Sequence, residues 1–349
     1  MDSLKARKII AVDLFCGAGG LTRGLINSGV FVKAGIDFDK NCKYPYTANN
    51  NADFILKSIT DVTSDELQRY FLKDSINLLA GCAPCQTFSK YNPFANETDK
   101  RWWLLLEFSR LINELQPELI TMENVPELAK QNVFDSFLQT LNKNKYNFSW
   151  QIVHCEDYGV PQRRSRLVVL ASKYAPIRLL APEEMGLKPQ TVKDAIGNLP
   201  KISAGAINLS DSLHRSPSLS ELNMKRIKCS KPGGTWRDWP PELIAECHSK
   251  KTGKSFSSVY GRMEWEKVAP TITTEFYSFG TGRFGHPEQN RAISLREGAI
   301  LQTFPYDYKF ISPNEVFSYK KIGKMIGNAV PVRVGEIIGK SFISHINNL

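Results

Sequence analysis

Four short segments of this 349-residue chain place reactive or charged side chains where apolar runs stop. One of them, residues 81–89 with the sequence GCAPCQTFS, contains Cys82 and Cys85. Two cysteines at this spacing suggest a structural zinc site, a redox pair or a nucleophile, because the thiolate is both a metal ligand and a nucleophile. Zinc needs two further ligands, and the other cysteines form no second pair. A buried inert thiol also explains Cys82, whereas Cys85 follows Pro84 in a polar turn and is the better candidate for reactivity.

Carboxyl and guanidinium groups stand in the next two segments. Glu123 ends an apolar run, where partial burial would make its carboxyl group hold a proton more tightly and allow it to donate that proton. The segment QRRSR at residues 162–166 leads into the apolar run RLVVLA, so Arg164 and Arg166 leave the same face of an extended chain. Each group alone fits a surface charge or a structural salt bridge. Together they bring a thiol, an acid and a guanidinium pair to one edge of one sheet.

The fourth segment, DLFCGAGGL at residues 13–21, is a glycine-rich turn between an apolar run and a helical pattern. Glycines let backbone amides approach a ligand closely, and a helix N-terminus favours a carboxylate or phosphate. The dinucleotide fingerprint would require glycine at position 22, where Thr22 stands. Asp37 ends the next apolar run and can accept hydrogen bonds from both hydroxyls of a ribose. A nucleoside ligand without a pyrophosphate is favoured over an ordinary glycine-rich turn.

The first 172 residues alternate apolar runs with helical patterns, which predicts βαβ units, an α/β fold and a mainly parallel sheet. The predicted strands are residues 8–15, 31–37, 76–81, 118–123, 148–155 and 166–171. The predicted helices are residues 20–28, 64–71, 102–115 and 134–142. Because ligands bind at the carboxyl ends of the strands in such sheets, we expect the four segments to form one site.

The composition indicates a folded protein, and the charge suggests an anionic partner. Hydrophobic residues make up 42% and charged residues 23% of the chain, and no apolar stretch approaches the length of a membrane helix. The net charge of +10 suggests a polyanion, although a generally basic proteome has the same effect. Residues 173–265 contain 15 lysines and arginines against 9 acidic residues. The start of the chain lacks a signal-peptide cleavage site, and seven scattered cysteines indicate a reducing compartment, so we expect a cytoplasmic protein.

The four segments and two later ones resemble, in their order and spacing, the motifs of the bacterial cytosine-C5 DNA methyltransferases. The six are DLFCGAGGL, APCQTFS, MENV, QRRSR, REGAILQTFP and GNAVP, and they extend from about residue 9 to the C-terminus. One such motif is weak evidence, but six in the family's order are specific. The resemblance implies a Rossmann-like methyltransferase sheet with a smaller, irregular target-recognition domain, and S-adenosylmethionine as the cofactor.

The resemblance also implies catalytic roles. Cys85 would add to C6 of a cytosine flipped out of the duplex, which activates C5 toward a methyl group. Glu123 would bind the N3 and amino edge of the base, and Arg166 would contact O2. Arg164 and Gln162 would hold the catalytic loop and the flipped nucleotide. No metal is implied.

S-adenosylmethionine would lie over the glycine-rich turn, with Asp37 on the ribose and Phe38 against the adenine. Ser58 stands where the family often has an acidic residue at the adenine amino group, and Ile59 keeps an apolar contact. The remaining residues assigned to the cofactor by the resemblance are Asp13, Phe15, Cys16, Gly17, Gly19, Gly20, Leu21, Asn328 and Val330.

Double-stranded DNA is the implied partner. We expect a cofactor-binding and catalytic domain at residues 1–174, a target-recognition domain at 175–285, and a C-terminal segment at 286–349 that returns to the catalytic domain. The loop 86–100 would close over the DNA, and the predicted DNA contacts are Gln86, Ser89, Arg101, Trp236 and Arg237. The implied enzyme is a monomer, paired with a restriction endonuclease that acts independently.

Two alternatives stay open at this point. The branch of the family that methylates transfer RNA shares the catalytic residues, but it carries a Cys-Phe-Thr tripeptide that this chain lacks. A catalytically silent DNA-binding relative would lack the reactive groups, whereas Cys85, Glu123 and Arg166 are all present.

Overall fold

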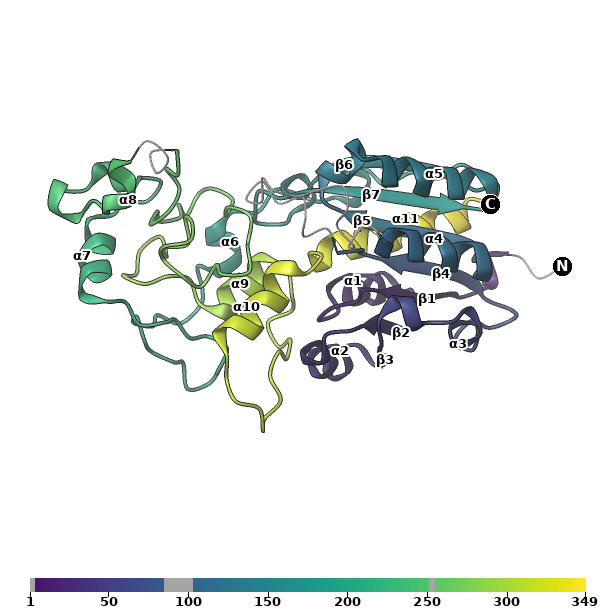
Figure 1. The fold of residues 1–349 in the computed structure, drawn as a ribbon, viewed down its shortest axis with the longest axis horizontal. Helices are drawn as coiled ribbons and strands as arrows, with labels where there is room; N and C mark the ends of the chain where they lie inside the picture. Colours follow the sequence, from purple (N-terminus) through teal and green to yellow (C-terminus); the bar gives the residue numbers. More distant parts are fainter. Residues whose placement is uncertain (1–3, 85–102, 251–254) are drawn as a thin grey trace. The chain divides into compact units, whose positions relative to one another are not determined.

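The computed structural model describes residues 4–84, 103–250 and 255–349, and it divides the chain into two compact units (Figure 1). Unit 1 consists of residues 1–158, 165–187 and 329–349, and unit 2 consists of residues 159–164 and 188–328. This division differs from the expected boundaries at residues 174 and 285. Residues 286–328 belong to unit 2, because helices α9 (Leu295–Leu301) and α10 (Tyr319–Asn328) pack on each other and α9 packs on α6 (Val192–Ile196).

Unit 1 contains a seven-stranded sheet with the strand order β3-β2-β1-β4-β5-β7-β6. The strands are β1 (Ile9–Leu14), β2 (Phe31–Asp37), β3 (Asp53–Leu56), β4 (Ile76–Gly81), β5 (Leu119–Asn124), β6 (Asn147–His154) and β7 (Ser165–Ser172). Strands β1 to β5 pair in parallel, as the sequence predicts. Strand β7 lies between β5 and β6 and is antiparallel to both. The carboxyl end of β5 therefore meets the start of β7.

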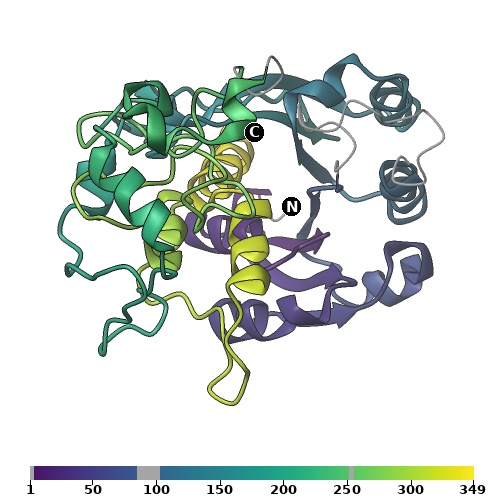
Figure 2. The same ribbon diagram turned by 60° about the vertical axis from the view of Figure 1, so that its left-hand side comes forward.

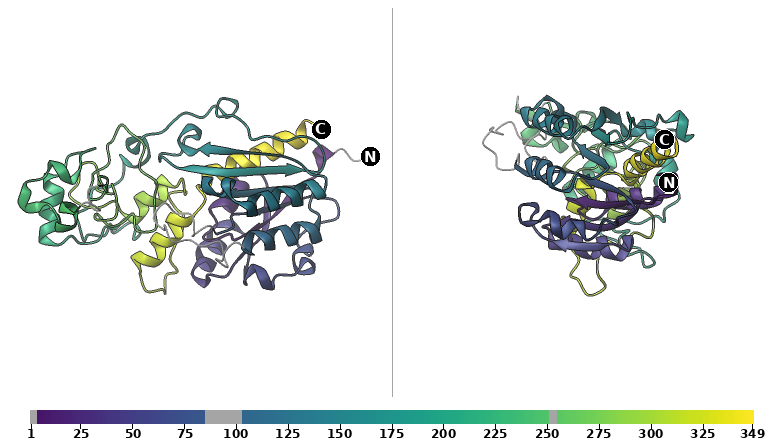
Figure 3. Two further views of the ribbon diagram at one scale, coloured as in Figure 1. Left: turned by 45° about the horizontal axis from the view of Figure 1, so that its top comes forward. Right: turned by 90° about the vertical axis from the view of Figure 1, so that its right-hand side faces the viewer.

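Helices cover both faces of the sheet. Helices α4 (Trp103–Leu115) and α5 (Asn132–Lys143) pack against each other on one face, and α1 (Gly20–Ser28) and α11 (Val332–Asn347) pack against each other on the opposite face (Figures 2 and 3). Two shorter helices, α2 (Lys43–Asn50) and α3 (Ser64–Gln68), flank β3 in the sequence. Parallel strands buried between two helical layers need apolar side chains on both faces, and every residue of β1 is buried accordingly.

Close backbone contact joins α1 to the C-terminal segment. A Cβ atom on Gly20 would overlap the carbonyl oxygen of Val330, and one on Gly24 would overlap backbone atoms of Val332 and Glu336. Glycine is required at these two positions because any side chain would separate the helices. Helix α11 is thus the part of the predicted returning segment that joins unit 1.

Strand β3 and helix α2 of unit 1 are absent from the predicted elements. Strand β3 is a four-residue edge strand with no buried residue, and α2 has a mixed polar sequence, KYPYTANN. Neither has the apolar periodicity on which the prediction rests. Helix α1 has the predicted bounds, and the predicted helix at residues 64–71 is shorter in the structure, ending at Gln68.

Unit 2 has short helices and long connecting segments. Its other helices are α7 (Glu221–Cys229) and α8 (Glu246–Ser249). A buried hydrophobic cluster of unit 2 includes Trp236, Trp239 and Phe279. The buried guanidinium of Arg262 donates to the carbonyl oxygens of Ile227, Ser230, His286 and Gln289. One buried arginine thus satisfies carbonyl groups from several loop segments of unit 2.

No helix in the described part of the chain is both long enough and apolar enough to cross a membrane.

Candidate active site

The predicted cofactor loop is a tight turn that leads from β1 into α1. Phe15, Gly17 and Gly19 have positive φ angles of 59°, 52° and 91°. Two glycines make this left-handed path inexpensive, whereas Phe15 adopts it at a cost in backbone strain. The amide of Cys16 donates to the carbonyl oxygen of Ile36 at 3.0 Å, which ties the turn to the end of β2.

Asp37 closes this turn from the neighbouring strand. Its Oδ2 accepts a hydrogen bond from the Gly17 amide at 2.9 Å, and its Oδ1 accepts one from the Asp39 amide at 2.8 Å. Each carboxylate oxygen has a further lone pair, so the carboxylate that shapes the loop can still accept hydrogen bonds from a ligand. The side chain of Phe38, next to it, is 68% exposed.

These features fit S-adenosylmethionine. Apart from the two chain neighbours of Gly17, no atom of the described residues lies within 4 Å of the position that a Cβ on Gly17 would occupy, so these residues leave space above the loop. Asp37 supplies acceptors for ribose hydroxyls, and Phe38 supplies an exposed ring for stacking on adenine. Ser58 precedes the 3₁₀ helix η3 (Ile59–Asp61), and its hydroxyl lies 2.8 Å from that of Thr60.

Several residues that the resemblance assigns to the cofactor are core residues whose side chains are buried. These are Asp13, Cys16, Leu21, Ile59 and Val330, each with at most 6% of its surface exposed. The carbonyl oxygen of Val330 lies against Gly20, so both residues are used in packing α1 on the C-terminal segment. Asn328 is exposed at the end of α10 and belongs to unit 2.

Glu123 and Arg166 form an ion pair at the carboxyl end of β5. Arg166 Nε lies 2.8 Å from Glu123 Oε1, and the two side chains are 13% and 1% exposed. The antiparallel register explains the contact: Glu123 pairs with Val168, and Arg166 stands two residues earlier, on the same face of β7. The predicted meeting of an acid and a guanidinium group at this sheet edge is therefore confirmed. A carboxyl group buried to this degree needs such a partner.

Cys82 is the third member of this group, which sequence reasoning missed. Its thiol donates a hydrogen bond to Glu123 Oε2 across an Sγ–Oε2 distance of 2.7 Å. Burial and the negative charge of Glu123 raise the pKa of the Cys82 thiol well above its ordinary value. The sequence feature that could have indicated this contact is the position of Cys82 directly after β4, a strand that neighbours β5. The amide of Asn124 also donates to the carbonyl oxygen of Ala83 at 3.0 Å, which holds the segment after β4 against β5.

Gln162 and Arg164 bind main-chain atoms of unit 2. The Gln162 amide nitrogen donates to the Leu301 carbonyl oxygen at 2.8 Å, and its Oε1 accepts from the Ile272 amide at 3.0 Å. Arg164 donates to the carbonyl oxygens of Ile272 and Gly327 at 3.1 and 3.3 Å. Both side chains are buried and hold three separate segments of unit 2 together. Arg164 belongs to unit 2 and binds its main chain, whereas Arg166 belongs to unit 1 and pairs with Glu123.

Of the predicted DNA contacts, the structure describes Trp236 and Arg237. Trp236 is 6% exposed, donates from Nε1 to the Phe256 carbonyl oxygen at 2.9 Å, and stacks on His248. This burial argues against a base contact by Trp236, because the ring is part of the core of unit 2. Arg237 is exposed. The predicted nucleophile Cys85, the predicted loop 86–100, and Gln86, Ser89 and Arg101 lie outside the described residues.

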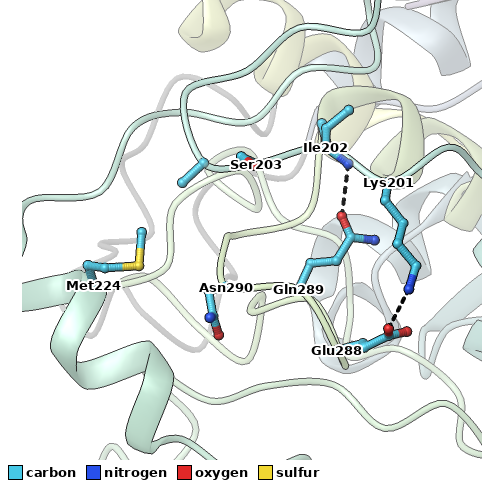
Figure 4. Close-up of a pocket in the computed structure, with 8 residues that line it drawn as sticks. Lys201, Ile202, Ser203, Met224, Glu288, Gln289 and Asn290 are labelled. Carbon is cyan, nitrogen blue, oxygen red and sulfur yellow. Dashed lines mark hydrogen bonds and ion pairs between the residues drawn. The ribbon is translucent and has the colours of Figure 1, made fainter.

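Unit 2 has an open pocket of about 500 Å³ that none of the predicted site residues line (Figure 4). Lys201 and Glu288 form an ion pair of 2.6 Å at its rim, and Gln289 accepts a hydrogen bond from the Ile202 amide at 3.0 Å. Its polar groups thus bind one another across the opening. Among the described residues, no cluster of histidine, cysteine and acidic side chains could hold a metal ion.

Comparison with known proteins identifies the family of the chain. The family model for the C-5 cytosine-specific DNA methylases matches residues 9–344. The type II methylase M.HgiDII of Herpetosiphon aurantiacus is 51% identical over 341 residues, which cover 97% of this chain and 96% of the relative. The type II methyltransferase M.Sau96I of Staphylococcus aureus is 30% identical, with 96% of this chain and 76% of the relative covered.

A solved structure shows the same fold. A protein encoded within an Escherichia coli prophage, whose structure is described as that of a DNA modification methyltransferase by assignment, has a TM-score of 0.74 at 22% identity, and the match covers 98% of this chain and 100% of that one. The family match and the 51% identical relative span nearly the whole chain. This chain therefore belongs to the C-5 cytosine-specific DNA methylase family, whose members transfer a methyl group from S-adenosylmethionine to C5 of a cytosine in DNA.

Proposed function

We propose that the protein is the modification methyltransferase of a type II restriction-modification system, and that it methylates one cytosine within a short DNA sequence. Two relatives named as type II enzymes support this proposal, because one is 51% and the other 30% identical over nearly all of this chain. The expected partners are double-stranded DNA and a cognate endonuclease that acts independently. The expected form is a cytoplasmic, nucleoid-associated monomer.

Cys85 acts as the nucleophile in this proposal. Its thiolate adds to C6 of the flipped-out cytosine, and the electron pair of the C5–C6 double bond moves so that C5 can take a methyl group. Bound S-adenosylmethionine supplies that methyl group as an electrophile. A base then removes the C5 proton, the double bond re-forms, and Cys85 leaves C6 with its electron pair. A free cysteine is mostly protonated at neutral pH, so the site must favour the thiolate at Cys85.

Glu123 binds the N3 and amino edge of the cytosine, and Arg166 contacts O2. The observation that carries this proposal is the ion pair of these two residues at the carboxyl end of β5. A carboxyl group and a guanidinium group held 2.8 Å apart match adjacent polar positions on one edge of a pyrimidine. Such groups are most effective where water is excluded, and Glu123 is 1% exposed.

Asp37 and Phe38 bind the ribose and the adenine of the cofactor, and its other end lies over the turn at Gly17 and Gly19. Ser58 stands beside the adenine amino group. Asp13, Phe15, Cys16, Gly20, Leu21, Ile59, Asn328 and Val330 complete the proposed set, and the buried members of that set act by shaping the loop.

Sequence recognition falls to unit 2, chiefly to its irregular residues 188–285, and catalysis falls to unit 1, which includes the C-terminal residues 329–349. Arg237 is a candidate for DNA contact because its charged side chain is exposed. We keep Gln86, Ser89 and Arg101 as proposed contacts of the catalytic loop. Gln162 and Arg164 act indirectly, by holding the backbone of unit 2.

A trapped adduct tests the proposal. Polymerase copies of bacteriophage lambda DNA that contain 5-fluorocytosine are incubated with the protein and S-adenosylmethionine, then separated in denaturant. Fluorine at C5 cannot leave as a proton does, so the enzyme should stay attached to the DNA through Cys85. We expect an adduct with the wild type and none with Cys85→Ala. An adduct of equal yield with Cys85→Ala would refute the assignment of the nucleophile. No adduct and no methylation by the wild type on lambda DNA would refute the enzyme proposal.

A further inference from the structure

The thiol of Cys82 donates a hydrogen bond to the carboxyl group of Glu123, the residue proposed to bind the base. Cys82 follows β4, its amide donates to the Leu14 carbonyl oxygen at 3.2 Å, and the parallel register pairs the preceding Gly81 with Met122. The next residues along the two strands are Cys82 and Glu123, so the backbone alone brings these side chains together. The Sγ–Oε2 distance of 2.7 Å makes the contact a hydrogen bond.

In this contact Cys82 is the donor. Burial and the charge of Glu123 both raise the pKa of the thiol, so the proton stays on sulfur at neutral pH. A thiol that keeps its proton is a poor nucleophile. Cys82 is therefore suited to hydrogen bonding and not to attack on a base.

The two oxygens of Glu123 have different partners, Arg166 on β7 and Cys82 directly after β4. Oε1 lies 2.8 Å from Arg166 Nε, and Oε2 accepts from Cys82. The terminal torsion of a glutamate is broad, so one donor leaves the plane of the carboxyl group free to rotate. A hydrogen bond at Oε2 and an ion pair at Oε1 restrict that rotation, and each oxygen still has a lone pair for a substrate.

We propose that Cys82 is a positioning residue of the methyl transfer: its S–H bond to Oε2, together with Arg166 on Oε1, sets the plane in which Glu123 meets the flipped cytosine. This inference rests on the proposed role of Glu123 as the group that binds the base. Cys82 acts only through Glu123 and has no contact with the substrate in this scheme.

Two substitutions separate the hydrogen bond from the volume of the side chain. Cys82→Ala removes the donor, and Cys82→Ser keeps a donor on a similar side chain. Single-turnover methylation of unmethylated bacteriophage lambda DNA is measured with each full-length variant. We expect Cys82→Ala to slow the methylation step on the order of tenfold or more, as for the loss of one hydrogen bond to a charged group. Cys82→Ser should recover most of the rate.

The same variants should keep wild-type KM for S-adenosylmethionine and wild-type thermal midpoints, because the carboxyl group changes orientation without a change in the cofactor loop. Cys155→Ala is the matched control. Cys155 is a fully buried cysteine of unit 1 outside the site, so its loss removes a thiol without removing a donor to Glu123. The rate of that variant should match the wild type.

Infrared spectroscopy supplies a readout that does not depend on activity. The difference spectrum of wild type minus Cys82→Ala isolates the S–H stretching band of Cys82. A hydrogen bond to a carboxylate lowers the frequency of this band, and Glu123→Gln replaces the carboxylate with a neutral amide. We expect the band to move to higher frequency in Glu123→Gln.

Three results would overturn the proposal: a wild-type rate in Cys82→Ala, a rate in Cys82→Ser as low as in Cys82→Ala, or an S–H band that Glu123→Gln leaves unmoved. Failure of the proposed function would give a different set of results from failure of this inference. In that case the wild type forms no adduct and methylates no cytosine, while the S–H band still reports whether Cys82 binds Glu123.

Discussion

Asp13 should make unit 1 less stable as the pH rises through neutrality. Its side chain is fully buried on β1, between β2 and β4. Oδ2 accepts a hydrogen bond from the Thr22 hydroxyl at 2.6 Å, and Oδ1 has no hydrogen-bond partner among the described residues. Burial, with a smaller contribution from the charge of Asp37, raises the pKa of Asp13 from its ordinary 3.8 to about 7.

The direction of the effect follows from proton binding. Between pH 3.8 and about 7 the folded protein keeps a proton on Asp13 that the unfolded chain has lost. The free energy of unfolding contributed by this residue therefore falls as the pH rises through that window. A pKa difference of about three units, at about 1.4 kcal/mol each, amounts to about 4 kcal/mol above pH 7. At pH 5 about 2 kcal/mol of this loss is already present.

Asp13→Asn removes the titration and keeps the shape of the side chain. We expect the stability of the variant relative to the wild type to increase by about 2 to 3 kcal/mol between pH 5 and pH 8. Urea unfolding followed by circular dichroism at several pH values measures this difference, and the change with pH is independent of any constant effect of the amide. Asp135→Asn, on the exposed face of α5, is the control and should leave the free energy of unfolding close to that of the wild type. A stability difference for Asp13→Asn that stays constant from pH 5 to pH 8 would refute the reasoning.

Two further substitutions test packing, one in unit 2 and one in unit 1. Glu297 is buried in unit 2; burial alone would raise its pKa, but the Arg291 guanidinium at 2.7 Å lowers it from 4.5 to about 2. The pair thus stabilises the fold by about 3 kcal/mol above pH 4.5, and this stabilisation is lost as the pH falls through about 2. Glu297→Gln should therefore lower the free energy of unfolding at pH 7 by a similar amount, measured by urea unfolding. A loss below about 1 kcal/mol would contradict the role of the pair. Gly24→Ala should cost about 1 to 3 kcal/mol, because a methyl group there meets the backbone of α11. Thermal unfolding compares it with Asn27→Ala at an exposed position of α1, and equal midpoints for the two variants would show that α1 and α11 tolerate separation.

Glu123 and Arg166 could be predicted from the sequence because each stands at the end of a strand. Glu123 ends an apolar run and Arg166 begins one, and parallel strands collect their carboxyl ends at one edge. The contact itself depends on β7 lying antiparallel beside β5, which no local pattern reports. Cys82 was judged by its CxxC spacing with Cys85, although its partner is 41 residues away on β5. Trp236 was assigned to DNA by its place in a basic segment, whereas its ring lies in the core of unit 2.

The sequence by itself determined the strands with strong apolar periodicity and both bounds of helix α1. It also determined the glycine-rich turn with Asp37 beside it, and the family. These features depend on side chains close together in the chain, where backbone conformation and hydrophobic spacing act locally. Only the tertiary structure decided that residues 286–328 join unit 2 while α11 packs on α1, that β7 lies between β5 and β6, and that Cys82 donates to Glu123. Such contacts join segments far apart in sequence, and their energies arise from burial and register, which the chain acquires only on folding.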